Sequence, residues 1–300
     1  MKDVAMRFGL AVALLTGLLA THADAEMIVG LTSQNSLVNF DSATPGTVGP
    51  QVAITGTSGN IVAIDRRPNG GALYGLDANN NLYTINAVSG VATFASRPAT
   101  GPTSQLIGFD FNPVPDRLRI TDSNGSNLRI NVDTGATIVD TPLAYAASDA
   151  NAGVRPSVVA SAYTNSFAPS PRTTPGTTLY GIDSNLGILV LQNPPNAGTL
   201  NTVGRLGITV NGSVGFDISG LSGTAYLSST AGQSTDLYRV NLSNGAATRI
   251  GSVGSGVLLR SIAAPLGIAA VPEPAGLVLL GTGAIALLGY RRSRRKTAGA

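Results

Sequence analysis

Three aspartates end similar apolar phrases, and they are the residues of this chain best suited to chemistry. The phrases are Val62–Asp65, Ile107–Asp110 and Val214–Asp217. If equivalent strands of a ring carry them, the three carboxylates meet near its centre, where oxygen ligands suit a hard cation such as Ca²⁺ or a polar ligand. We therefore predict a candidate ligand-binding group of Asp65, Asp110 and Asp217. The alternative is that each Asp caps a turn by accepting backbone N–H groups.

Residue types that other chemistries need are missing. The chain has no Cys and no Trp, its single His is His22, and its only lysines are Lys2 and Lys296. A serine nucleophile would lack a base, and zinc would lack ligands. We expect no catalytic residue, no metal motif and no required cofactor, with calcium left open. A two-aspartate hydrolase or lyase acting on polysaccharide stays as an alternative, since Glu26 and Glu273 are the only glutamates.

Other polar residues have a functional and a structural interpretation. The segments Asp77–Asn81 and Asp122–Gly125 look like calcium loops but fall where hairpin turns belong. Arginines and tyrosines at repeated positions could bind an anionic sugar or stack on one, or could be solvated charges and packing residues. These are Arg66, Arg67, Arg117, Arg119, Arg129, Tyr74, Tyr83, Tyr180, Tyr226 and Tyr238.

The body of the chain is a repeat that positions these residues. Phrases such as Leu82–Asn86 alternate apolar and polar residues, as half-buried strands do, and turn residues of the Asn/Ser-x-Gly kind follow them. The Asp-ending phrase and its relatives at Tyr163 and Ile262 recur about every 45 to 54 residues. Four short strands at that period predict a propeller blade.

Five repeats predict an all-β chain with a five-bladed propeller of four-stranded blades. The first unit begins at its second strand, near Ile28, and Leu258–Ala263 supplies an orphan first strand. Pairing the two would close the ring and remove its free edges. A four- or six-bladed ring and an open β-sandwich are the alternatives.

The net charge of +3 belongs to the ends of the chain, not to its body. Residues 26–270 contain 12 Arg, no Lys, 12 Asp and one Glu. The body has no basic stripe that could bind a phosphate backbone, so nucleic acid is not an expected partner.

The N-terminus has the pattern of a secretory signal. Lys2 and Arg7 precede the apolar stretch Phe8–Ala20, and Ala23 and Ala25 are the small residues that a signal peptidase reads. We predict a signal helix over residues 1–25, cleaved after Ala25.

The C-terminus combines three features in order. Pro272, Glu273 and Pro274 are followed by the apolar run 275–290, predicted to be a transmembrane helix, and by a basic tail over 291–300. The positive-inside rule keeps the tail cytoplasmic and the body outside the inner membrane. This pattern resembles the PEP-CTERM sorting signal of Gram-negative bacteria. The resemblance implies that the triplet is recognised by an exosortase-type transpeptidase.

The repeated phrases, such as Leu73–Asp77 and Leu179–Asp183, resemble an uncharacterised bacterial domain family of unknown function that is frequent in PEP-CTERM proteins. The resemblance implies a propeller over residues 26–265, joined to the triplet by a linker over 266–274. Because the sorting system is associated with matrix-producing bacteria, it also implies a link to exopolysaccharide. We expect an exported binding or scaffolding module, held at the inner membrane and then delivered to the cell surface or matrix. A purely structural matrix protein is the remaining alternative.

Overall fold

The computed structural model describes residues 25–168, 176–210 and 213–268. The predicted signal up to residue 24, the triplet Pro272-Glu273-Pro274, the apolar run and the basic tail lie outside the described residues. Within these ranges the regular elements are β-strands and one 3-10 turn, η1 (Pro195–Ala197). None of the described elements is a helix with the length and apolarity that crossing a membrane requires.

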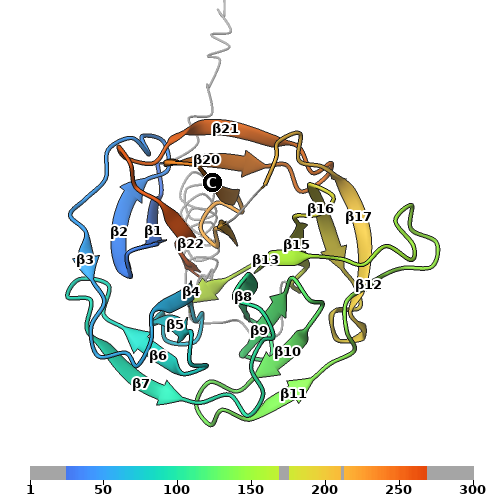
Figure 1. Cartoon of the computed structure of the whole chain (residues 1–300), viewed down its shortest axis with the longest axis horizontal. Coiled ribbons are helices and arrows are strands. Elements are labelled where there is room, and N and C mark those ends of the chain that lie inside the picture. Colours follow the sequence, from blue (N-terminus) through green and yellow to red (C-terminus); the bar gives the residue numbers. More distant parts are fainter. Residues whose placement is uncertain (1–24, 169–175, 211–212, 269–300) are drawn as a thin grey trace, which may run out of the picture.

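Five sheets stand around a common axis, as the repeat predicted (Figure 1). From the axis outward, blade one consists of β22 (Leu259–Ala263), β1 (Met27–Thr32), β2 (Ser36–Asp41) and β3 (Val52–Ala53), and blade two of β4 (Ile61–Arg66), β5 (Leu73–Asp77), β6 (Leu82–Ile85) and β7 (Ala92–Ser96). Blade three consists of β8 (Ile107–Asn112), β9 (Arg117–Asp122), β10 (Asn127–Ile130) and β11 (Thr137–Val139), and blade four of β13 (Val158–Tyr163), β15 (Leu179–Asp183), β16 (Ile188–Gln192), β17 (Thr199–Arg205) and β12 (Ala144–Tyr145). Blade five consists of β18 (Val214–Ile218), β19 (Ala225–Ala231), β20 (Ser234–Val240) and β21 (Ala247–Ser252). We call β4, β8, β13, β18 and β22 the inner strands.

The ring closes through its two ends, as predicted. Inner strand β22 pairs with β1 in antiparallel register, with Gly30 opposite Ile262. Blade one is therefore built from both termini of the body, and no inner strand is left without its blade. One further pair lies outside the blades: β14 (Phe167–Ala168) runs parallel to β23 (Gly267–Ile268).

The recurrent glycine after the third strand has two tasks. In blade two the Asn86 side chain accepts the N–H groups of Val88 and Ser89, and Gly90 adopts φ 74°. A Cβ at Gly90 would also collide with the carbonyl oxygen of Ala53 in blade one. Thus the turn needs glycine both for its positive φ and for the close approach of neighbouring blades. Blades three and five repeat this arrangement at Gly135 and Gly245.

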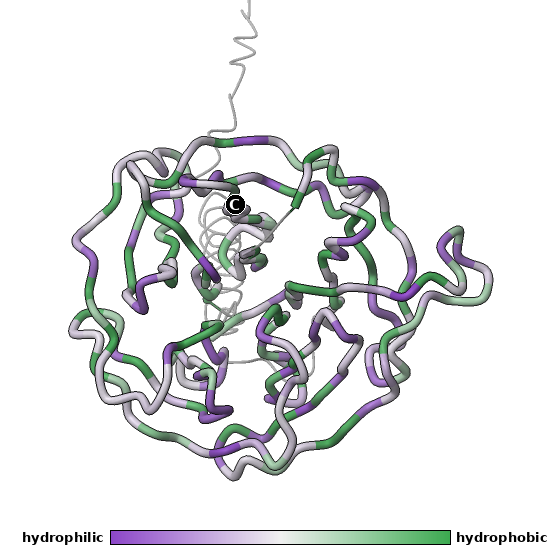
Figure 2. The backbone as a smooth tube through the Cα atoms, viewed as in Figure 1, coloured by the Kyte–Doolittle hydropathy of each residue, from purple (hydrophilic) through white to green (hydrophobic). Residues whose placement is uncertain are grey.

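The hydrophobic core lies between the blades, and hydrophobic residues recur along the strands around the whole ring (Figure 2). The rings of Tyr74 in blade two and Phe111 in blade three meet edge to face at 5.3 Å. Both residues are almost fully buried, and burial of one such side chain stabilises the fold by about 1.5–3 kcal/mol.

The strand registers correct the predicted alignment of two repeats by one residue. Asp65, Asp110 and Asp217 lie opposite Tyr74, Arg119 and Tyr226 of the second strands. In blades four and one the corresponding residues are Ala162, opposite Tyr180, and Ala263, opposite Val29, not Tyr163 and Ile262. A shift of one residue moves a side chain to the other face of its strand, so the difference matters for what lines the axis.

Candidate functional site

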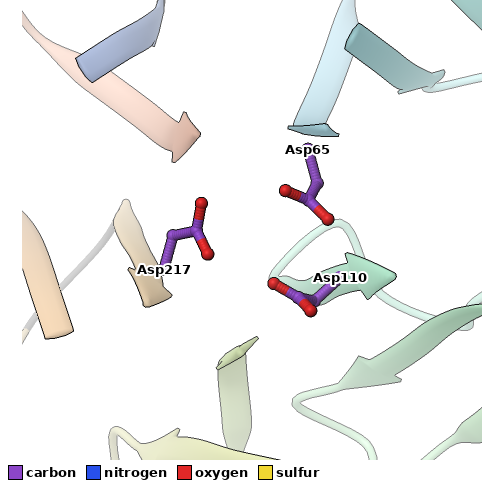
Figure 3. A group of neighbouring side chains, drawn as sticks. All are labelled: Asp65, Asp110 and Asp217. Atoms are coloured by element: carbon purple, nitrogen blue, oxygen red, sulfur yellow. The ribbon is translucent and has the colours of Figure 1, made fainter. Parts of the chain in front are cut away.

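The three predicted aspartates converge at one end of the inner strands. Figure 3 shows the carboxylates of Asp65, Asp110 and Asp217 pointing toward one another from β4, β8 and β18. One oxygen from each lies within 4.8 Å of the others, and all three residues are buried. We call this end of the ring the Asp end. The opposite end, where the inner strands begin, is the Arg end, named after Arg260 of β22.

Each carboxylate also joins its own blade to the next. Asp65 accepts the backbone N–H of Phe111 at 2.9 Å, Asp110 that of Tyr163 at 3.0 Å, and Asp217 that of Ala264 at 2.6 Å. Each donor directly follows the matching position in the next inner strand. The capping interpretation of these aspartates is therefore correct in part: Asp65 and Asp217 also accept the N–H of the residue that follows each, Arg66 and Ile218, whereas the long-range bonds run between blades.

The blades that carry alanine at this position are joined differently. From blade one to blade two, the Ser261 hydroxyl accepts the N–H of Ile64 at 3.2 Å. Between blades four and five, the β14–β23 pair lies beside Gly220, whose N–H bonds to Pro265. A Cβ at Gly220 would collide with both Ser166 and Gly267. The pair therefore ties blades four, five and one together at the Asp end.

The three carboxyl groups resist ionisation. Burial raises the pKa of Asp65 well above its ordinary value, and the nearby Asp217 raises it further. Burial, then Asp65 and Asp217, do the same to the pKa of Asp110. Burial raises the pKa of Asp217 to about 6, although the N–H groups of Ala264 and Ile218 oppose the rise. Hence a retained proton or a bound cation would relieve the repulsion among the three carboxylates.

The cluster can therefore hold a proton or a small cation. Calcium binds oxygens at about 2.3–2.6 Å, so two ligands across the ion lie roughly 5 Å apart, close to the spacing found here. A sugar ring has less opportunity, because the residues are only 2–6% exposed. Among the described residues these three are the one group of acidic side chains with a metal-like arrangement.

The segments that look like calcium loops are turns, as expected. Asp77 accepts the N–H groups of Asn79 and Asn81, and Asp122 accepts those of Asn124 and Ser126. Burial raises the pKa of Asp77, but these N–H donors and Ser58 more than offset it, so the pKa is lowered overall.

The arginines noted in the sequence are mostly internal ion-pair partners. Arg67 binds Asp116 and Asp133, and Arg119 and Arg129 share Asp140. Arg119 is 1% exposed, which excludes it as a surface sugar contact and corrects the idea of a scattered solvated charge. Among the tyrosines, Tyr74, Tyr83 and Tyr226 are buried packing residues, as the structural interpretation predicted.

Sequence reasoning missed Arg260. It lies in β22 three residues before Ala263, and the matching residues of the other inner strands are apolar: Val62, Ile107, Val159 and Val214. All five line one cavity of about 140 Å³ at the Arg end. The signal becomes readable only when the inner strands are aligned in the register that the structure provides.

Both ends of the described body leave the ring at the Asp end. Met27 pairs with Asp41 and lies beyond the Val29–Ala263 pair, and Ile268 closes the β14–β23 pair. Ala25 and Ile268 are exposed, whereas Glu26 is 2% exposed and its N–H bonds to Ser42. The predicted cleavage site thus falls where the chain enters the folded body.

The fold has a distant likeness among solved structures. A structural genomics protein of unknown function from Bacteroides thetaiotaomicron is 13% identical with a TM-score of 0.46, over 79% of this chain. The chain spans 64% of the length of that protein. Among curated proteins, no relative matches.

Two families match parts of the sequence. Residues 270–295 match the PEP-CTERM protein-sorting motif, so this is an exported protein that an exosortase recognises and that is anchored at the membrane through its C-terminus. Residues 36–263, which span nearly the whole ring from β2 to β22, match a second family. The chain belongs to the family described as Domain of unknown function (DUF4394).

Proposed function

We propose that this protein is a non-enzymatic module that binds an extracellular polymer, foremost exopolysaccharide. The module is displayed from the membrane with its Arg end outward. One observation carries the proposal: both ends of the described body leave the ring at the Asp end. The side that carries the anchor faces the membrane, and the opposite side faces the polymer.

The distance to the sorting triplet supports this orientation. Pro272 follows Ile268 by four residues, and an extended chain of that length spans at most roughly 14 Å. While the anchor is in place, so short a connection keeps the Asp end close to the bilayer. The predicted signal joins the body at the same end, so the membrane can hold both termini without a strand crossing the ring.

The state of the carboxylates supports binding over catalysis. A hydrolase needs an acid and a base that reach the scissile bond. Asp65, Asp110 and Asp217 instead accept backbone N–H groups from neighbouring blades and are buried. In this proposal the three aspartates join the blades, and a bound Ca²⁺ would stabilise the ring.

The first test is glycan-array binding by purified residues 26–270, with Ca²⁺ and with chelator. This piece contains every strand of the closed ring. Saturable binding to a polysaccharide without product formation is the expected result. A blank array with folded protein would contradict the proposal and favour a protein partner or a purely structural matrix role.

The enzymatic alternative has its own readout. Asp110→Asn and Asp217→Asn should leave binding intact, and neither the native protein nor the variants should release reducing ends from a bound polysaccharide. Turnover by the native protein that both variants lose would overturn the non-enzymatic proposal.

A further inference from the structure

The cavity at the Arg end has the composition of a small ligand site. Its walls are apolar side chains of four inner strands, and its polar groups come from Arg260, Gln105 and Ser213. More of the accessible surface of this cavity is polar than apolar, so the polar groups of these three residues dominate what a ligand would meet. A cavity of about 140 Å³ corresponds to about five water molecules at roughly 30 Å³ each, and a cavity of about this size can admit one six-membered ring.

Arg260 differs from the arginines that the fold uses for itself. Arg67, Arg119, Arg129 and Arg249 each form an ion pair with an aspartate. Within the described part of the chain, the Arg260 side chain makes no hydrogen bond or ion pair, although it is partly buried in this cavity. A charge in such surroundings gains from a partner of opposite sign, because the walls replace part of its water.

The break in symmetry places this charge close to the axis. Four blades put Val or Ile at the position and only blade one, which the chain ends build, puts Arg there. All five blades thus place a side chain at this position, but only blade one places a charged side chain there. A single guanidinium suits one planar, bidentate acceptor such as a carboxylate.

A second cavity continues the first toward the rim. It measures about 300 Å³, shares Val62 and Gln105 with the first, and runs along Pro102–Ser104 and Asn80. Asp77 also lines it, but the Asp77 carboxylate already accepts hydrogen bonds from Ser58, Asn79 and Asn81. The two together form a groove between blades two and three that begins at Arg260. Neighbouring residues of a chain-like ligand can therefore lie beside the residue held at the axis.

We infer that this groove binds an acidic saccharide, with the carboxylate of one uronic acid residue held by Arg260 and the neighbouring sugars along Gln105 and Thr103. The inference rests on the proposed function and names its ligand class. The carboxylate supplies specificity, because the apolar walls cannot distinguish one sugar from another by charge. The Asp end takes no part in this recognition.

The test is calorimetric titration of residues 26–270 with tri-galacturonic acid in the presence of chelator, so that Ca²⁺ cannot bridge ligand and protein. The methyl ester of the same trisaccharide keeps its shape and removes its charges. Arg260→Gln removes the proposed contact, and Arg260→Lys keeps the charge without the fork. Arg155→Gln is the matched control, because Arg155 is exposed, precedes the inner strand β13 and does not line the cavity.

We expect binding of the acid to exceed that of its ester about tenfold or more, the usual range for a charge-assisted bidentate pair. Arg260→Gln should lose the same factor, Arg260→Lys should lose less, and Arg155→Gln should stay within about twofold. A second variant, Val62→Phe, fills the junction of the two cavities and should weaken the trisaccharide more than galacturonic acid itself.

Two results would overturn the inference while leaving the proposed function in place: equal affinity for acid and ester, or a polysaccharide that binds Arg260→Gln as well as the native protein. An equal loss in Arg155→Gln would also overturn it, because the attraction would then be diffuse. If no glycan of any charge binds, the proposed function fails as well.

Discussion

The two ends of the ring place charged groups near the axis in opposite ways. At the Asp end, three carboxylates crowd within 4.8 Å, each accepts backbone N–H groups, and all are buried. At the Arg end, the guanidinium of Arg260, which has no partner among the described residues, lies in a cavity shared by all five inner strands. Between the two ends, Ile64, Phe109, Phe216 and Ile262 of the inner strands are 1–6% exposed and pack in the cores between neighbouring blades.

The difference shows why charge density alone is a poor guide to function. The crowded carboxylates look more like a site, yet their hydrogen bonds are committed to holding blades together. The isolated arginine looks unremarkable in the sequence, yet its hydrogen-bonding capacity is free for a ligand. Polar groups that the fold satisfies stabilise it, and those it leaves unsatisfied are available for recognition.

The largest expected effect comes from disturbing the contact between the inner strands β18 and β22, which runs between the two ends. A Cβ at Gly215 of β18 would lie 2.7 Å from the backbone nitrogen of Ile262 in β22, so backbone must move. Gly215→Ala should therefore lower the free energy of unfolding by about 3 kcal/mol, as overpacking does. Urea unfolding measures it.

The matched control is Gly176→Ala. Nothing lies within 4 Å of a Cβ there, and Gly176 is exposed, so stability should change by less than about 0.5 kcal/mol. Equal stability of the two variants would mean that β18 and β22 are not closely packed.

The next effect concerns the Asp end and its pH dependence. A carboxyl whose folded pKa is raised stabilises the fold fully below the unfolded pKa, and this contribution disappears as pH rises through the folded pKa. For Asp217 the interval runs from the ordinary value of 3.8 to about 6, so without divalent cation the protein should lose stability as pH rises from about 4 to beyond 6. Melting temperatures across this range, in chelator, follow the change.

Asp110→Asn should reduce that loss. An amide at this position can still accept the Tyr163 N–H, and it no longer repels Asp65 and Asp217. Near pH 8 we expect a gain of about 1–2 kcal/mol, on the scale of one pKa unit. Asp236→Asn is the control of opposite sign: Arg249, then Ser252, lowers the pKa of Asp236, so its loss should destabilise near neutral pH.

A calcium titration distinguishes a cation site from blade joining alone. If it binds, the ion should raise the melting temperature of the native protein near pH 8 and do so far less in Asp110→Asn, because binding to the folded state stabilises it. Equal responses would assign the three carboxylates to blade joining alone.

The sequence predicted the ring well because its repeats carry strong local signals. Strand alternation and the Asn-x-x-x-Gly turns of Asn86–Gly90 and Asn241–Gly245 indicated blades, and the leftover strand at Leu258–Ala263 indicated closure. The convergence of Asp65, Asp110 and Asp217 followed from the same alignment. These features depend on residues close together in the chain or on simple repetition.

Contacts between distant segments could not be predicted in this way. In blades four and one no Asp marks the register, so Ala162 and Ala263 were misaligned by one residue, and Arg260 could not be matched to Val62 or Val159. The two-residue strands β14 and β23 are too short to show alternation, and they pair across about a hundred residues of sequence. The arginine partners Asp116 and Asp140 belong to no motif.

The smallest expected effect tests which end faces the membrane. Because the chain has no cysteine, one can be placed at each end: Val154→Cys, 41% exposed and near the start of β13, and Leu221→Cys, 59% exposed and just after β18. In the detached body, Leu221→Cys should react with a bulky maleimide at least as fast as Val154→Cys. In the anchored protein the order should reverse by a few fold, because the bilayer shields the Asp end but leaves the Arg end open. The same order in both states would contradict the orientation on which outward display of the Arg260 cavity depends, whereas a reversal would establish the Asp end as the membrane side.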